Sequence, residues 1–204
     1  MNSSIVAARD LVPVSTELGA APVDCLVNIV GELRPTRASG GSVAEYSVGL
    51  DCAPIYRGER ALTAAEKAGL GGGVSLQVFT RACVYANRMI GAGGEGDILT
   101  ELTTRQDFQY DGLYVTWDSG SGSTYNHWST GWGVISSWIN TSISTVPTPD
   151  YHVDSGASFS FFGSWHHDKN NWTHAYGDGN CAFTYQHNGY VCRGCDTRFY
   201  VFYL

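Results

Sequence analysis

Apolar and polar residues alternate with a period of two along much of this chain. In the clearest stretch, residues 43–52, Ala44, Tyr46 and Val48 share one face. The polar residues Glu45, Ser47 and Asp51 fall on the other face. Such alternation predicts strands with one face in a core and the other in water. Roughly nine strands are expected in this way, drawn from residues 23–33, 43–52, 74–87, 108–110, 113–117, 134–143, 157–162, 185–187, 190–192 and 198–204.

Two dipeptides between these stretches predict tight hairpins. Asp111-Gly112 follows the aromatic stretch 108–110, and Asn188-Gly189 follows residues 185–187. Both dipeptides favour the positive φ angles of a two-residue hairpin turn. Each is therefore expected to reverse the chain.

One short helix is predicted near residues 63–69. Thr63 and Glu66 have the spacing of a capping box, and Gly69 and Gly71 provide a stop signal at the carboxyl end. The helix makes about two turns at most, so it needs tertiary support to form.

These elements predict an all-β protein, an antiparallel β-sandwich or barrel-like fold stabilised by disulfides. Residues 23–204 are expected to form a single β domain. The alternative is two lobes, 23–90 and 98–204, joined by a glycine-rich link. Residues 1–22 are expected to be an N-terminal tail that docks by adding a strand to its own sheet or to a partner's.

The chain contains six cysteines, an even number that favours a disulfide framework. Three precede the glycine-rich stretch 91–96 and three follow it, so complete pairing requires at least one bridge between the two halves. A less favoured interpretation is a structural zinc ion held by Cys181, His187, Cys192 and Cys195. No other cofactor is expected. The predicted disulfide residues are Cys25, Cys52, Cys83, Cys181, Cys192 and Cys195.

The charge balance limits the classes of partner. The formal net charge is −7, and Lys67 and Lys169 are the only lysines, which argues against a nucleic acid partner. No apolar run reaches the roughly 20 residues of a membrane span, so membrane insertion is not expected. Residues 1–19 contain no recognisable secretory signal. With the disulfide interpretation, this predicts a secreted, extracellular protein whose signal has been removed.

Every tryptophan and every histidine lies between residues 117 and 187. The segments 118–131 and 163–180 are rich in Ser, Gly, Asn, Trp and His, and they are predicted to be binding loops. Rigid aromatic groups beside adaptable polar groups are typical of binding surfaces. The candidate binding residues are Trp128, Trp165, His166, Asp168, Asn171, Trp172 and His174.

We therefore expect a non-enzymatic extracellular binding or assembly module. Its partner would be a protein subunit of a larger complex or a glycan, contacted through the tail and the two loops. No G-x-S-x-G nucleophile motif is present, and no glutamate follows Glu101. The alternatives are a small secreted hydrolase that uses Asp and His residues, and a phage or virion surface (decoration) protein.

Overall fold

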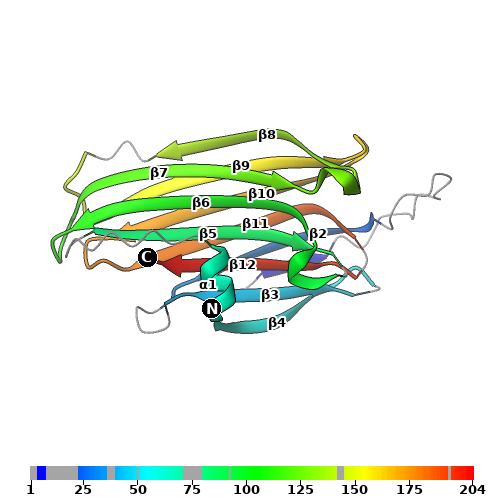
Figure 1. The fold of residues 1–204 in the computed structure, drawn as a ribbon, viewed down its shortest axis with the longest axis horizontal. Helices are drawn as coiled ribbons and strands as arrows, with labels where there is room; N and C mark the ends of the chain where they lie inside the picture. Colours follow the sequence, from blue (N-terminus) through cyan, green and yellow to red (C-terminus); the bar gives the residue numbers. More distant parts are fainter. Residues whose placement is uncertain are drawn as a thin grey trace.

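A computed structural model confirms an all-β antiparallel sandwich, with twelve strands in place of about nine. The strands form two six-stranded sheets that run along the long axis of the molecule (Figure 1). The described residues are 4–7, 23–35, 40–49, 51–70, 80–91, 93–141, 145–192 and 194–204.

The first sheet, sheet A, has the strand order β1-β2-β11-β10-β9-β8. The second, sheet B, has the order β4-β3-β12-β5-β6-β7. Each sheet therefore takes strands from both sides of residues 91–96. The strands of sheet A are β1 (Ser4–Ala7), β2 (Val23–Leu33), β8 (Trp132–Thr141), β9 (Asp150–Phe161), β10 (Trp165–Tyr176) and β11 (Cys181–Cys192). Those of sheet B are β3 (Ser42–Val48), β4 (Pro54–Ala61), β5 (Thr80–Ile90), β6 (Ile98–Tyr110), β7 (Val115–Asn126) and β12 (Asp196–Tyr203).

Within the predicted tail, β1 pairs antiparallel with β2 of the same chain and forms an edge of sheet A. The rest of the tail, residues 1–3 and 8–22, lies outside the described residues, as do residues 74–79 of the strand predicted over 74–87. Docking of the tail onto a partner stays a prediction.

The predicted short helix is confirmed as α1 (Ala64–Gly69). Thr63 Oγ1 accepts a hydrogen bond from the Glu66 backbone N–H at 3.3 Å, and Glu66 Oε2 accepts one from the Thr63 N–H at 2.8 Å. Glu66 also pairs with Arg60 at 2.7 Å, and this interaction lowers the pKa of Glu66 to about 2. The capping box and the ion pair together fix this single helix against sheet B, where Figure 1 shows it.

Strand β5 is buried on both faces. Cys83 and Tyr85 belong to the main core between the sheets. Val84 belongs to a second apolar cluster, with Leu62 and Leu70 from either end of α1. The apolar alternation of Ala82 and Val84 by itself predicts that Val84 faces the main core and Cys83 faces away, and the structure has the reverse. Both faces are covered, so a period of two in apolar residues cannot distinguish them.

The hairpin predicted at Asp111-Gly112 is confirmed, since β6 and β7 pair antiparallel on either side of it, but its loop has the four residues 111–114 in place of two. Asp111 Oδ1 accepts backbone hydrogen bonds from Leu113 at 2.9 Å and Tyr114 at 2.8 Å. These two bonds hold the pKa of Asp111 below its usual value. The turn is therefore stabilised from within its own loop.

The hairpin predicted at Asn188-Gly189 is wrong, because β11 continues straight through both residues. Gly189 pairs with Val27 on β2 and with His167 on β10, so the strand is held on both sides at this point. A Cβ atom at Gly189 would lie 2.5 Å from the His166 carbonyl oxygen and 2.7 Å from His167 Cα. The glycine therefore permits a close approach of β10, with φ at +122°, and does not turn the chain.

All six cysteines form disulfides: Cys25–Cys52, Cys83–Cys181 and Cys192–Cys195. Cys83 precedes the glycine-rich stretch and Cys181 follows it, which confirms the bridge that cysteine parity required. No thiolate of the alternative zinc cluster is left to bind a metal. No helix among the described residues is long and apolar enough to cross a membrane.

The inward face of β10 is polar, which is unusual for a sandwich core. His167, Lys169, Asn171 and Thr173 follow one another on this face, and each is buried. Burial of such groups is costly unless they are hydrogen-bonded.

Three of these side chains bond across to sheet B. His167 Nε2 lies 3.1 Å from Thr100 Oγ1, and Asn171 Nδ2 donates to Thr104 Oγ1 at 3.0 Å. Lys169 Nζ donates to the carbonyl oxygen and to Oδ1 of Asn87, at 3.0 and 3.1 Å. Burial lowers the pKa of the Lys169 amine well below its ordinary value.

A carboxyl group is also buried between the sheets. Both carboxylate oxygens of Asp118, on β7, are inaccessible to solvent. Burial raises the pKa of Asp118 to about 7, against a smaller opposing effect of Gln106. The group therefore changes charge near neutral pH.

The close approach at Gly189 can be tested by Gly189→Ala. A methyl group would meet backbone atoms of β10, and alanine is strained at this φ, so we expect a loss of about 3 kcal/mol in the free energy of unfolding. The matched control is Gly133→Ala on β8, where a Cβ meets nothing within 4 Å. It should change stability by less than about 1 kcal/mol. Urea unfolding of both variants measures this, and equal losses would contradict the close approach.

The buried Asp118 carboxyl predicts a pH dependence. Its pKa is about 7 in the folded protein and near the ordinary 3.8 when unfolded, so its contribution to stability is complete below pH 3.8 and is lost as the pH rises through 7. Asp118→Asn removes this dependence. The unfolding free energy of the wild type minus that of the variant should fall by about 2 kcal/mol between pH 4 and pH 8, which is less than the full pKa shift would give because the Asp118 residue as a whole is only half-buried. A difference that is independent of pH would show that Asp118 titrates normally.

Candidate functional site

The predicted binding loops at 118–131 and 163–180 are for the most part strands. β7 extends to Asn126, and β10 occupies Trp165–Tyr176. A Ser-, Gly- and Asn-rich composition is typical of loops, but here pairing with neighbouring strands satisfies the backbone. Whether a candidate residue on β10 can reach a ligand therefore depends on the face of the strand on which it lies.

Alternation along β10 separates the candidates. His166 and Asp168 are exposed, whereas Trp172 and His174 are half-buried, and all four lie on the outer face of sheet A. Asn171 faces the interior, where it is buried against Thr104. The structure thus brings His166, Asp168, Trp172 and His174 to one surface and removes Asn171 from it.

The other two predicted tryptophans do not join this surface. Trp165 packs against the core, with its ring centroid 5.9 Å from that of Phe161. The backbone of Trp128 lies in a short 3-10 helix, Trp128–Thr130, and its side chain is outside what the structure describes.

A neutral row of side chains crosses the outer face of sheet A. Trp138 pairs with Gly156 on β9, Gly156 with Asn170 on β10, and Asn170 with Gln186 on β11. Asn170 Nδ2 donates to Gln186 Oε1 at 3.1 Å, and Gln186 Nε2 donates to Asn28 Oδ1 on β2 at 3.2 Å. We call these four side chains, Trp138, Asn170, Gln186 and Asn28, the amide row. Its three amides are held in place by their mutual hydrogen bonds.

Gly156 makes room for the amide row. A Cβ atom at this position would lie 2.4 Å from the Trp138 ring and 2.6 Å from Asn170 Oδ1. The Trp138 side chain thus lies over the backbone of β9 and is 43% exposed. The next position along β10 on this face is Trp172, which pairs with Asp154.

Two histidines and one aspartate meet beyond Trp172. His152 on β9 and His174 on β10 are a direct cross-strand pair, with ring centroids 4.1 Å apart. Asp150 Oδ2 lies 3.1 Å from His152 Nε2 and 3.3 Å from His174 Nδ1. The potential ligand atoms of this Asp150–His152–His174 triad all lie within 4.8 Å of one another. Among the described residues, it is the one group of three His, Cys, Asp or Glu side chains this close.

Two further groups border the triad. Burial raises the pKa of Asp154, while His152 and His174 act in the opposite direction, which places this carboxyl near both imidazoles. Tyr176 stacks on His174 with the two rings 12° from parallel. Burial raises the pKa of the Tyr176 hydroxyl.

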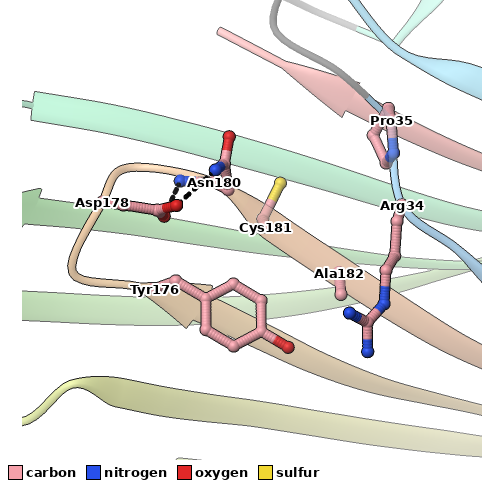
Figure 2. A pocket seen from close by; sticks show the side chains of 7 residues that line it. All are labelled: Arg34, Pro35, Tyr176, Asp178, Asn180, Cys181 and Ala182. Atoms are coloured by element: carbon pink, nitrogen blue, oxygen red, sulfur yellow. Dashed lines mark hydrogen bonds between the residues drawn. The ribbon is translucent and has the colours of Figure 1, made fainter.

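A cleft of about 740 Å³ adjoins the triad through Tyr176. Figure 2 shows Tyr176 and Arg34 on two sides of Ala182, whose small side chain lies between them. The turn between β10 and β11 closes one end, where Asp178 Oδ1 accepts a hydrogen bond from the Asn180 N–H at 2.9 Å. Arg34 pairs with Glu32 on β2.

Sequence reasoning missed Asp150, His152 and Asp154, and among the cleft residues it missed Arg34, Pro35 and Ala182, whereas Tyr176, Asp178 and Asn180 lie in the predicted segment 163–180. The first three follow a period of two in residues 150–154, and this was the available signal that they share a face. Arg34 reaches the cleft because β2 pairs with β11, a contact between residues about 150 positions apart that no local pattern reveals.

Comparison with known proteins gives no relative. No protein-family model matches the chain, and no curated protein and no solved structure matches it.

Proposed function

We propose that the protein is a non-enzymatic extracellular binding module that recognises a neutral glycan through the outer face of sheet A. The observation that carries this proposal is the amide row, in which Trp138 and the linked amides of Asn170, Gln186 and Asn28 lie beside Trp172. Sugars present apolar ring faces and many hydroxyls. Indole rings suit the first, and side-chain amides, which both donate and accept hydrogen bonds, suit the second.

The rigidity of the row also supports binding. Each amide is held by a neighbouring amide, and the strands that carry Asn170 and Gln186 are paired on both sides. Groups already fixed in the binding geometry lose little conformational entropy when a ligand arrives. A flat sheet face of this kind suits an extended chain of sugars.

The charges favour a neutral ligand. The amide row has no charged residue, and Asp154 and Asp168 lie on the same face. Of the two lysines, Lys169 is buried between the sheets, where its amine bonds to Asn87, so it does not reach the outer face. The net charge of −7 likewise disfavours acidic polymers. The three disulfides are consistent with an extracellular location, where such bonds persist.

Subunit assembly is a second candidate function, and β8 favours it. This strand forms an edge of sheet A, contains no charged residue, and exposes Val134, Ile135 and Ile139. Long uncharged edge strands are templates for pairing with another chain. A protein partner subunit, including a second copy of this chain, would bind there.

Assembly through β8 predicts that a charge introduced on this strand weakens self-association. Ile135→Lys places an ammonium group on the exposed edge, so it should shift the self-associated protein to the monomer, by at least tenfold in the dissociation constant. Sedimentation velocity over a concentration series measures this shift. The matched control is Ile55→Lys on β4, the edge strand of sheet B at the opposite side of the sandwich, where Ile55 is 40% exposed. A wild type that stays monomeric at all concentrations would rule out self-assembly through β8.

Glycan recognition predicts loss of binding when the indoles of sheet A are removed. On an array of neutral glycans the wild type should bind, and Trp172→Ala and Trp138→Ala should each weaken binding about 30-fold, as expected for a central aromatic contact. The control is Trp117→Ala, because Trp117 is 45% exposed but lies on β7 of sheet B. Absence of binding by the wild type, or an equal loss in Trp117→Ala, would contradict the proposal.

A further inference from the structure

The Asp150–His152–His174 triad does not take part in the amide row. Its side chains are about one third exposed, at 34%, 40% and 29%, so the group is open to small solutes. Imidazole nitrogens and a carboxylate oxygen are the ligand types found in zinc sites with three protein ligands.

The separations between the atoms fit a tetrahedral ion. Two ligand atoms that each lie 2.0–2.1 Å from a zinc ion at the tetrahedral angle are about 3.3 Å apart. Asp150 Oδ2 lies 3.1 Å from His152 Nε2 and 3.3 Å from His174 Nδ1. The two imidazole nitrogens lie within 4.8 Å of each other, so the three ligand atoms surround a space of the size that one ion occupies.

The strands hold these side chains in place. His152 and His174 are directly opposed in the β9–β10 ladder, and Asp150 is two residues from His152 on the same face. β10 is also paired with β11, where Ala182 is the partner of His174. The triad is thus built on regular strands, which position ligands more reproducibly than loops do.

Ion pairs between Asp150 and the two histidines leave one oxygen of the Asp150 carboxylate unaccounted for. One carboxylate oxygen, Asp150 Oδ2, faces both imidazoles, while Oδ1 is buried without a hydrogen-bond partner. A metal ion accepts all three ligands at once, with both imidazoles neutral.

We propose that Asp150, His152 and His174 form a binding site for one divalent transition-metal ion, with zinc as the best match. Three protein ligands leave one tetrahedral position open for water or another ligand. Asp154, two residues beyond His152, adds negative charge beside the ion. Calcium and magnesium, which prefer oxygen ligands, should not bind here. The proposal does not depend on glycan recognition.

The test uses the full chain with its disulfides intact, freed of metal with a chelator that is then removed. Titration with Zn²⁺ in a calorimeter should give one ion per chain. His152→Ala, His174→Ala and Asp150→Asn should each weaken Zn²⁺ binding at least about 100-fold, since even the removal of outer-shell partners costs 10- to 100-fold. The control is His166→Ala, because His166 is an exposed histidine on β10, the strand of His174. This variant should change the affinity for Zn²⁺ by less than about threefold. Mg²⁺ and Ca²⁺ should give no binding.

Two readouts keep the test independent of folding and of the proposed function. Co²⁺ in the wild type should give the intense visible absorption of a tetrahedral site, and Zn²⁺ should displace it. Trp172→Ala should retain Zn²⁺ binding even where it loses a glycan. Absence of stoichiometric Zn²⁺ binding by the wild type, or an equal loss in His166→Ala, would overturn the metal site and leave glycan recognition unaffected.

Discussion

The fold depends on hydrogen bonds that join the polar inward face of β10 to sheet B. Asn171 donates to Thr104, and the amine of Lys169 donates to Asn87 across the interior. Each of these groups is buried, so a shift in the packing of the sheets would leave polar atoms without partners, at a cost of about 1–3 kcal/mol for each atom. An apolar interface would tolerate small displacements, but this one fixes how the sheets meet.

The same constraint positions the outer face. Side chains alternate along a strand, so a register that places Lys169 and Asn171 inward also places Asn170 and Trp172 outward. The Cys83–Cys181 bridge reinforces this by tying sheet B to the start of β11, and closure of a loop this long is worth about 4–5 kcal/mol in the chain-entropy model. The polar core and the exposed surface are therefore two consequences of one strand register.

The outer face of sheet A combines two chemistries on neighbouring rows. The amide row is neutral and aromatic, whereas the Asp150–His152–His174 triad offers one carboxylate and two imidazoles. Small residues make room on this face: Gly156 lets Trp138 lie over β9, and Ala182 lies in the cleft between Tyr176 and Arg34. The sheet fixes the backbone positions, and the small residues leave space in which larger neighbouring side chains such as Trp138 can pack.

The sequence by itself determined the features that depend on near neighbours. Strand alternation, the capping box at Thr63, the Asp111-Gly112 turn and the even number of cysteines each act through local or compositional rules. Tertiary structure decided the rest. Asn188-Gly189 favours a turn by local preference, yet it stays extended because β2 and β10 pair with it on both sides. The juxtaposition of His152 and His174 likewise exists only in the β9–β10 ladder, because which strands pair is settled by the burial of whole faces and not by local sequence.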